Sequence, residues 1–174
     1  MRKNYVMPLL VLTVICLVVS GALAFMNNVT HPVITLAAAE RAEAAMNAKI
    51  PDATGFEKIE FIDGDGIPET IVEIYSTTNG VGHVLIAAVN GFSGDITIIC
   101  GVDPDGRLIG ASTLSHTETK GIGTILEMPV FLDTFKGKDS GLEGVDTVTG
   151  ATISTRAFIR AINDVFDAYE KIRS

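Results

Sequence analysis

Residues 96–114, ITIICGVDPDGRLIGASTL, decide the fold class of this protein. Two apolar runs rich in β-branched residues, 96–102 and 108–114, flank Asp103-Pro104-Asp105-Gly106. Proline fixes φ at the entry of a turn and glycine accepts a positive φ, so this tetrapeptide is typical of a tight hairpin. The stretch therefore predicts two antiparallel strands joined by a turn.

Further strands are predicted before this hairpin, and helices are predicted at both ends of the soluble part. The strand-like runs are 55–62, 70–75 and 83–89, with a second turn at 91–95. Helices are predicted at 33–49, at 124–136 with an interruption at Pro129, and at 153–172, where apolar residues recur at helical spacing. Strands followed by segregated helices predict an α+β fold.

The N-terminal region predicts a membrane anchor. Residues 6–26 carry no charge and are long enough to cross a bilayer as a helix. A cleaved signal peptide is the alternative, but the run is longer than the apolar part of such signals. Arg2 and Lys3 precede the run, and the next basic residue is Arg41. The positive-inside tendency then places residues 1–5 in the cytoplasm, with a connecting helix in 27–54 and one extracytoplasmic domain, 55–174, at the cell membrane.

Charge and cysteine content exclude several function classes. After residue 26 the chain has 11 basic and 21 acidic residues, and such an acidic domain repels nucleic acid. Cys16 and Cys100 form no zinc or haem motif with a histidine. The segment 63–66, DGDG, begins like a calcium loop, but Ile74 occupies the twelfth position, where glutamate is needed. We therefore predict a plain turn there and no metal site.

The segment 146–154, DTVTGATIS, combines small residues and hydroxyls just before the last predicted helix. It is expected to join a strand-like piece to the helix N-terminus, where unpaired N–H groups attract a phosphate. A hydroxyl at this position is suited to carry a phosphoester. Alternatively, Thr152 or Ser154 is simply the N-cap of the helix, and Gly150 makes the turn.

The same segment resembles the flavinylation motif of a family of FMN-binding domains. The family comprises the G subunit of the Rnf ion-translocating ferredoxin:NAD oxidoreductase and the C subunit of the sodium-translocating NADH:quinone reductase. The resemblance implies that Thr152 receives FMN from FAD through a flavin transferase and holds it by a phosphoester. By position in the motif, it also assigns to the cofactor site Asp146, Thr149, Gly150, Ala151 and Ser154.

A second stretch, 115–123, SHTETKGIG, resembles the His-x-Glu-Thr-Pro-Gly-Leu-Gly loop that lies by the flavin in this family. The match adds to the cofactor site Glu118, Thr119, Gly121 and Gly123, with Lys120 in place of the proline. His116 is expected either beside the flavin or in a structural hydrogen bond. Arg156 is expected either to pair with the phosphate or to lie exposed on the helix.

The resemblance extends over nearly the whole chain, and the length of 174 residues favours the Rnf protein over its quinone-reductase counterpart. It implies an electron carrier in a membrane complex whose other subunits move Na⁺ or H⁺. A single span without an intramembrane charge cannot be the ion path by itself. The alternatives are the C subunit of the quinone reductase, a free-standing extracytoplasmic flavoprotein reductase, and a structural pilin-like protein, which would leave both flavin motifs unexplained.

Overall fold

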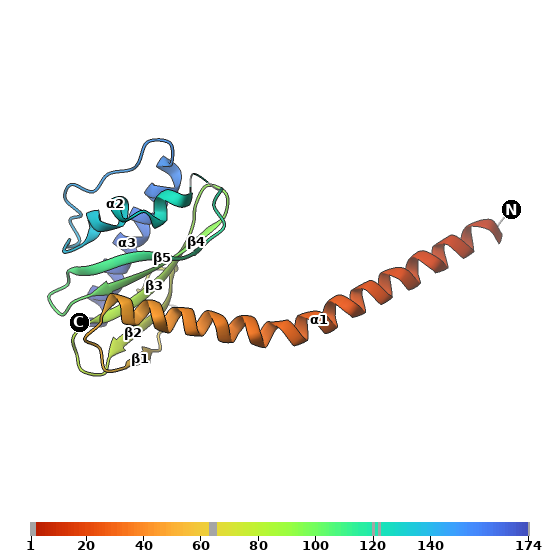
Figure 1. Cartoon of the computed structure of the whole chain (residues 1–174), viewed down its shortest axis with the longest axis horizontal. Coiled ribbons are helices and arrows are strands. Elements are labelled where there is room, and N and C mark those ends of the chain that lie inside the picture. Colours follow the sequence, from red (N-terminus) through yellow and green to blue (C-terminus); the bar gives the residue numbers. More distant parts are fainter. Residues whose placement is uncertain (1–2, 63–65, 120, 122, 174) are drawn as a thin grey trace. The chain divides into compact units, whose positions relative to one another are not determined.

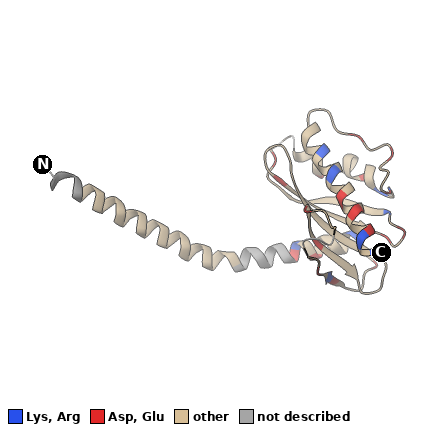
Figure 2. Cartoon of the chain, turned by 180° about the vertical axis from the view of Figure 1, so that it is seen from behind, with Lys and Arg blue, Asp and Glu red and all other residues tan. Residues whose placement is uncertain are grey.

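The computed structural model describes residues 3–62, 66–119, 121 and 123–173, and it divides into two compact units, Met1–Arg41 and Ala42–Ser174. The predicted turn at 63–66 and Lys120 therefore lie largely or wholly outside the described residues. In the first unit, Met7–His31 forms a helical stretch of 25 residues with a mean hydropathy of 2.7, which is long and apolar enough to cross a membrane. Figure 2 shows no charged residue along this stretch.

One helix, α1 (Lys3–Lys49), covers both the apolar stretch and the predicted second helix. The prediction of a separate helix beginning at residue 33 is wrong, because α1 continues through Pro32. Proline removes one helical hydrogen bond, but the alanine-rich residues that follow have high helix propensity. The predicted end at Lys49 is confirmed, and Ile50 N still donates to Met46 O at 3.0 Å.

Five antiparallel strands form a meander in the order β1-β2-β3-β4-β5 (Figure 1). Their bounds are β1 Phe56–Ile59, β2 Ile71–Thr77, β3 His83–Asn90, β4 Asp95–Val102 and β5 Leu108–His116. The α+β prediction is confirmed, and β2 to β5 lie within two residues of the predicted runs. Only β1 is markedly shorter than the predicted 55–62.

The hairpin that decided the fold class closes as predicted. Asp103 Oδ1 accepts hydrogen bonds from the backbone N–H groups of Asp105 and Arg107, at 3.0 and 2.8 Å. Gly106 has a φ of +82°, which only glycine adopts without strain. The carbonyl of Asp103 also accepts the hydroxyl of Tyr169 at 3.0 Å, so the turn is tied to the last helix.

Both faces of the central strands are covered within the second unit. The last helix, α3 (Thr152–Arg173), packs with the short helices against one face, and the end of α1 packs against the other (Figure 1). Side chains alternate accordingly: Leu85 and Ile98 belong to the core under α3, while Ile86 and Ile99 pack with Met46. This burial on two faces explains why β3 and β4 read as nearly continuous apolar runs.

The predicted interruption of the helix 124–136 at Pro129 is confirmed, but most of this segment is 3-10 helix and not α-helix. The chain instead forms the 3-10 helix η1 (Gly123–Glu127), one α-helical turn α2 (Pro129–Leu132) and a second 3-10 turn η2 (Asp133–Phe135). Pro129 begins α2, as expected for its fixed φ. Phe131 and Phe135 pack edge-on to each other and lie 5.3 Å from the ring of Phe158 in α3. Aromatic packing therefore holds these short turns against α3.

His83 is expected to make folding stability depend on pH. Its Nδ1 is buried and has no hydrogen-bond partner among the described residues, and its ring packs edge-on against Tyr169. Burial lowers the pKa of His83 from its ordinary value of 6.5, because the charged form is poorly solvated. Above pH 6.5, His83 is neutral in both the folded and the unfolded chain, and folding carries no penalty from its charge. As the pH falls below 6.5, the unfolded chain binds a proton at His83 more readily than the folded chain, so the free energy of unfolding falls. Melting temperatures between pH 7.5 and 5 should therefore fall less steeply for His83→Phe than for the wild type. If the melting temperatures of both proteins fell equally with pH, His83 would not be the source of this pH dependence.

Candidate functional site

The start of α3 is built differently from a normally capped helix. Ala151 O accepts the first helical hydrogen bond, from Thr155 N at 2.9 Å, so Ala151 is the N-cap residue and Thr152 the first residue of the helix. The prediction that Thr152 or Ser154 is the N-cap is wrong. Alanine has no side-chain oxygen for the N–H groups of the first turn, which is why it is a poor cap.

The approach to α3 is a turn and not a strand. Residues 145–148 have no regular structure, so the predicted strand-like piece is wrong, and Gly150 adopts a φ of +89°. Ala151 N donates to Val148 O at 3.0 Å, which closes the turn. The buried hydroxyl of Thr155 accepts from Val148 N at 3.2 Å and donates to Ala151 O at 3.0 Å. The side chain of Thr155 in α3 therefore holds the turn against the helix.

Thr152 is exposed, and its hydroxyl makes only a long contact, 3.5 Å, with Val148 O. It lines a cavity of about 260 Å³ together with Phe92, Gly150, Ala151, Ile153 and Ser154. Phe92 is 60% exposed and Ile153 is 55% exposed. The site therefore combines an exposed, weakly bonded hydroxyl at a helix start with two apolar side chains that are exposed to solvent.

Glu118 is bonded to two residues that line this cavity, Phe92 and Ser154, and is 7% exposed. Its Oε1 accepts from the N–H groups of Phe92 and Ser93, at 2.7 and 3.1 Å, and its Oε2 accepts the hydroxyl of Ser154 at 2.6 Å. Burial alone would raise the pKa of Glu118, but the hydrogen bonds from Ser154, Ser93, Phe92 and Gly94 outweigh burial and lower it. The carboxylate is therefore ionised at neutral pH, and these protein donors occupy both of its oxygens.

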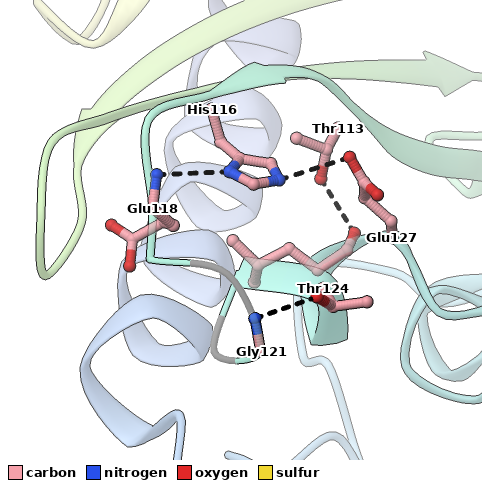
Figure 3. A network of polar contacts seen from close by, with 7 residues as sticks. Thr113, His116, Glu118, Gly121, Thr124 and Glu127 are labelled. Atoms are coloured by element: carbon pink, nitrogen blue, oxygen red, sulfur yellow. Dashed lines mark hydrogen bonds and ion pairs between the residues drawn. The ribbon is translucent and has the colours of Figure 1, made fainter.

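The loop that carries Glu118 is held from the opposite side by a polar network (Figure 3). His116 Nδ1 accepts the N–H of Glu118 at 3.2 Å, and His116 Nε2 lies 3.2 Å from Glu127 Oε1. Gly121 has a φ of +97°, and its N–H donates to Thr124 Oγ1 at 3.2 Å. Figure 3 shows the carboxylate of Glu118 pointing away from His116. His116 thus makes the structural hydrogen bond, which is one of its two expected roles.

The remaining predicted residues do not line this cavity. Thr119 is exposed, and its hydroxyl is 2.8 Å from that of Ser93. Gly123 is buried against Glu118 and His116. Asp146 is exposed and accepts the N–H of Thr147 at 2.6 Å, and Thr149 is exposed within the turn that Ala151 N and Val148 O close. The structure therefore places Gly150, Ala151, Thr152 and Ser154 at one cavity, and Glu118 is bonded to two of the residues that line it.

Arg156 is exposed one helical turn after Thr152. It lines a second hollow of about 220 Å³ with Asn90, Ile153, Ala157 and Arg160, and this hollow shares Ile153 with the first. Figure 2 shows basic residues on the first part of α3, followed by acidic residues and then by basic residues at its end. The positive charge on α3 nearest Thr152 thus comes from two arginines in a domain that is acidic overall.

Phe92 and Ile153 are the site residues that sequence reasoning missed. The sequence identifies 91–95 only as a turn, and apolar residues at the start of a helix are usually core residues. A phenylalanine inside a glycine-flanked turn is the available signal, since such turns lie at the surface. That the turn at 91–94 lies beside the loop after β5 becomes clear only when β4 pairs with β5 in the folded sheet.

The five-stranded antiparallel sheet with its helices matches an FMN-binding domain. The sequence model of the family described as FMN-binding domain matches residues 91–167, which include Phe92, Glu118 and Thr152. The crystal structure of NqrC from Shewanella oneidensis has the same fold, with a TM-score of 0.50 and 22% identity over 72% of this chain and 74% of that one.

Whole-length relatives identify the particular family. The chain is 30% identical to the G subunit of the ion-translocating oxidoreductase complex of Shewanella piezotolerans, over 93% of this chain and 88% of that protein. It is 29% identical to the protein of the same name from Methanosarcina acetivorans, over 95% and 94% of the two chains. It is 27% identical to the G subunit of the Na⁺-translocating ferredoxin:NAD⁺ oxidoreductase complex of Acetobacterium woodii, over 94% and 90%. The chain belongs to the family of G subunits of ion-translocating oxidoreductase complexes.

Proposed function

We propose that this chain is the electron-transfer subunit of a membrane-bound, ion-translocating ferredoxin:NAD oxidoreductase complex of the Rnf type, and that it carries FMN joined to Thr152 Oγ1 by a phosphoester. The observation that carries this proposal is the exposed, weakly bonded hydroxyl of Thr152 at the start of α3, where alanine is the N-cap. This hydroxyl lines a cavity in a member of the G-subunit family. When bound, FMN accepts electrons singly or in pairs, so it supplies a relay between other redox subunits.

The first turn of α3 fits a phosphate in chemistry as well as in place. Alanine at position 151 offers no side-chain oxygen to the N–H groups of this turn, and the helix start carries a partial positive charge. A phosphoester on Thr152 would accept hydrogen bonds from the groups that a serine or aspartate cap would otherwise satisfy. Arg156, one turn further, supplies a full positive charge on the same helix. The poor cap is thus consistent with an anion-binding role for the turn.

Phe92 and Ile153 are suited to hold the apolar part of the flavin. Both are more than half exposed and line the cavity on which Thr152 lies. An isolated protein gains little from exposing two large apolar side chains beside one another, whereas a planar ring system laid against them would remove their surface from water. We assign Phe92 and Ile153 to contact with the flavin ring system, and Thr152 and Arg156 to contact with the phosphate end of FMN.

The decisive experiment is the intact mass of the full-length protein produced together with a flavin transferase. We expect a mass increase equal to FMN less one water, which survives denaturation because the link is covalent. A protein that takes up no flavin under these conditions, or that loses it on denaturation, would contradict the proposed linkage. Purification of a tagged copy from its own membranes should bring polytopic membrane proteins with it, whereas a free-standing flavoprotein would come alone.

We further propose that α1 anchors the chain in the cytoplasmic membrane, with the N-terminus in the cytoplasm and the flavin domain outside. Labelling with a membrane-impermeant maleimide tests this orientation, because burial raises the pKa of Cys100 to about 12 and keeps its thiol unreactive. In a Cys16→Ser background, Asp105→Cys at the exposed hairpin should be labelled in intact cells, and Lys3→Cys only after permeabilisation. The reverse pattern would place the domain in the cytoplasm.

A further inference from the structure

The carboxylate of Glu118 joins three segments that are far apart in the sequence. It extends from the loop after β5, accepts two N–H groups of the turn at 91–94 through Oε1, and accepts the hydroxyl of Ser154 through Oε2. Ser154 is fully buried in the first turn of α3. The hydrogen bond between the hydroxyls of Ser93 and Thr119 ties the turn and the loop a second time, but it does not reach the helix.

Three nearby glycines leave room for the side chains of Glu118 and its neighbour Thr117. A Cβ on Gly91 would overlap Glu118 Oε1, and a Cβ on Gly123 would lie 2.6 Å from Glu118 Cβ. On Gly94, a Cβ would overlap the hydroxyl of Thr117. The backbone can approach Glu118 this closely only because these positions lack side chains. The loop motif alone does not reveal this close packing.

Two sides of the candidate flavin cavity meet at Glu118. Phe92, on one side, is held through its own N–H, and Thr152, on the other, is two residues before Ser154 in the same helical turn. The distance between the ring of Phe92 and the hydroxyl of Thr152 is therefore set through the carboxylate. An ionised acceptor forms stronger hydrogen bonds than a neutral one, which makes this connection stiff.

We propose, on the basis of the proposed function, that Glu118 is a positioning residue for flavin attachment: it holds Thr152 Oγ1 and Phe92 in the mutual placement that the transfer of FMN requires. In that transfer the bond from Thr152 Oγ1 to the phosphorus of the FMN half of FAD forms, and the P–O–P bond breaks. AMP leaves with the bridging oxygen, and the hydroxyl proton passes to the transferase or to water. Glu118 touches none of the reacting atoms and acts through Ser154 and the turn.

The test measures initial rates of FMN attachment to the full-length chain in detergent, with purified flavin transferase and FAD, while the concentration of the acceptor chain is varied. Misplacement of a reacting group by about 1 Å can cost a hundredfold in rate. We therefore expect Glu118→Ala to lower kcat about a hundredfold, with little change in KM for the chain. Glu118→Gln should lower kcat only about tenfold, because its carbonyl still accepts the turn N–H groups while its NH₂ cannot accept from Ser154.

Glu170→Gln is the matched control, since Glu170 is an exposed carboxylate at the far end of α3. It should keep the wild-type kcat. Amide hydrogen exchange at Phe92 and Ser93 should be faster in Glu118→Ala and unchanged in Glu170→Gln. If Glu118→Ala proves unfolded at the assay temperature, Ser154→Ala carries the test, because it removes only the link to α3.

The outcomes separate this proposal from the proposed function. A folded Glu118→Ala or Ser154→Ala chain that is loaded at the wild-type kcat overturns the positioning role and leaves the flavin site intact. A loss that lies entirely in KM also overturns it, because that result indicates a transferase contact. If the wild-type chain itself accepts no FMN, the proposed function fails, and the role of Glu118 in attachment fails with it.

Discussion

Thr152→Ala should abolish covalent FMN attachment completely, so that the mass increment seen for the wild-type chain disappears. Of the two hydroxyls nearest in the motif, Ser154 is fully buried and bonded to Glu118, and Thr149 lies within the turn and not at the helix start. The change should leave the fold intact, because alanine is well suited to the start of a helix and only a 3.5 Å contact is lost. Intact mass and in-gel flavin fluorescence after denaturation measure the result.

Two other variants make the Thr152 result specific. Thr149→Ala should retain full loading, and Thr152→Ser should retain part of it, because serine preserves the nucleophilic oxygen but is freer to rotate. The melting temperature of Thr152→Ala should stay close to that of the wild type, as expected for an exposed position. An FMN-sized increment that persists in Thr152→Ala would assign the linkage to a different residue.

Phe158→Ala should cause the largest loss of stability, about 3–5 kcal/mol. Phe158 is fully buried, and its ring contacts those of Phe131 and Phe135, with centroids 5.3 Å away in both cases. Removing it leaves a cavity under α3 at the point where the helix, the sheet and the short turns meet. Urea unfolding of the full-length chain in detergent, followed by circular dichroism, measures the change in the free energy of unfolding.

Phe92→Ala is the matched control, since it removes the same side chain from a position that is 60% exposed. It should change the free energy of unfolding by less than about 0.5 kcal/mol. If both variants lost the same stability, Phe92 would be a structural residue and its assignment to the flavin ring would fail. If neither did, the packing under α3 would not be the main core of the domain.

The fold was largely predictable because its strands have strong local signals. The turn at 103–106 and the apolar runs around it place β4 and β5 within two residues. In the segment 123–135, Pro129 predicted the interruption, but the apolar spacing fits an α-helix on either side of it, so the 3-10 turns were not predictable. The packing of Phe131 and Phe135 on Phe158 selects 3-10 turns instead, and Phe158 is distant in the sequence.

The candidate site was likewise only partly predictable from the sequence. The motif at 146–154 identifies Thr152 without the structure, but the sequence also allows Thr152 or Ser154 to be an ordinary cap. The structure makes Ala151 the cap and turns the hydroxyl of Ser154 inward to Glu118. The loop motif predicts Glu118 at the flavin edge, and the donors that occupy its two oxygens come from residues 26 and 36 positions away.

By itself, the sequence determined the α+β class, the strand order along the chain, the apolar anchor stretch and the threonine that carries the motif. These follow from local causes: turn residues, the period of apolar side chains and the length of an uncharged run. Only the tertiary structure decided which groups meet at that threonine. Phe92, Glu118 and Ser154 come together because the antiparallel sheet brings the turn before β4 beside the end of β5 and packs α3 across both. Contacts of this kind depend on the pairing of distant segments, and no local pattern encodes them.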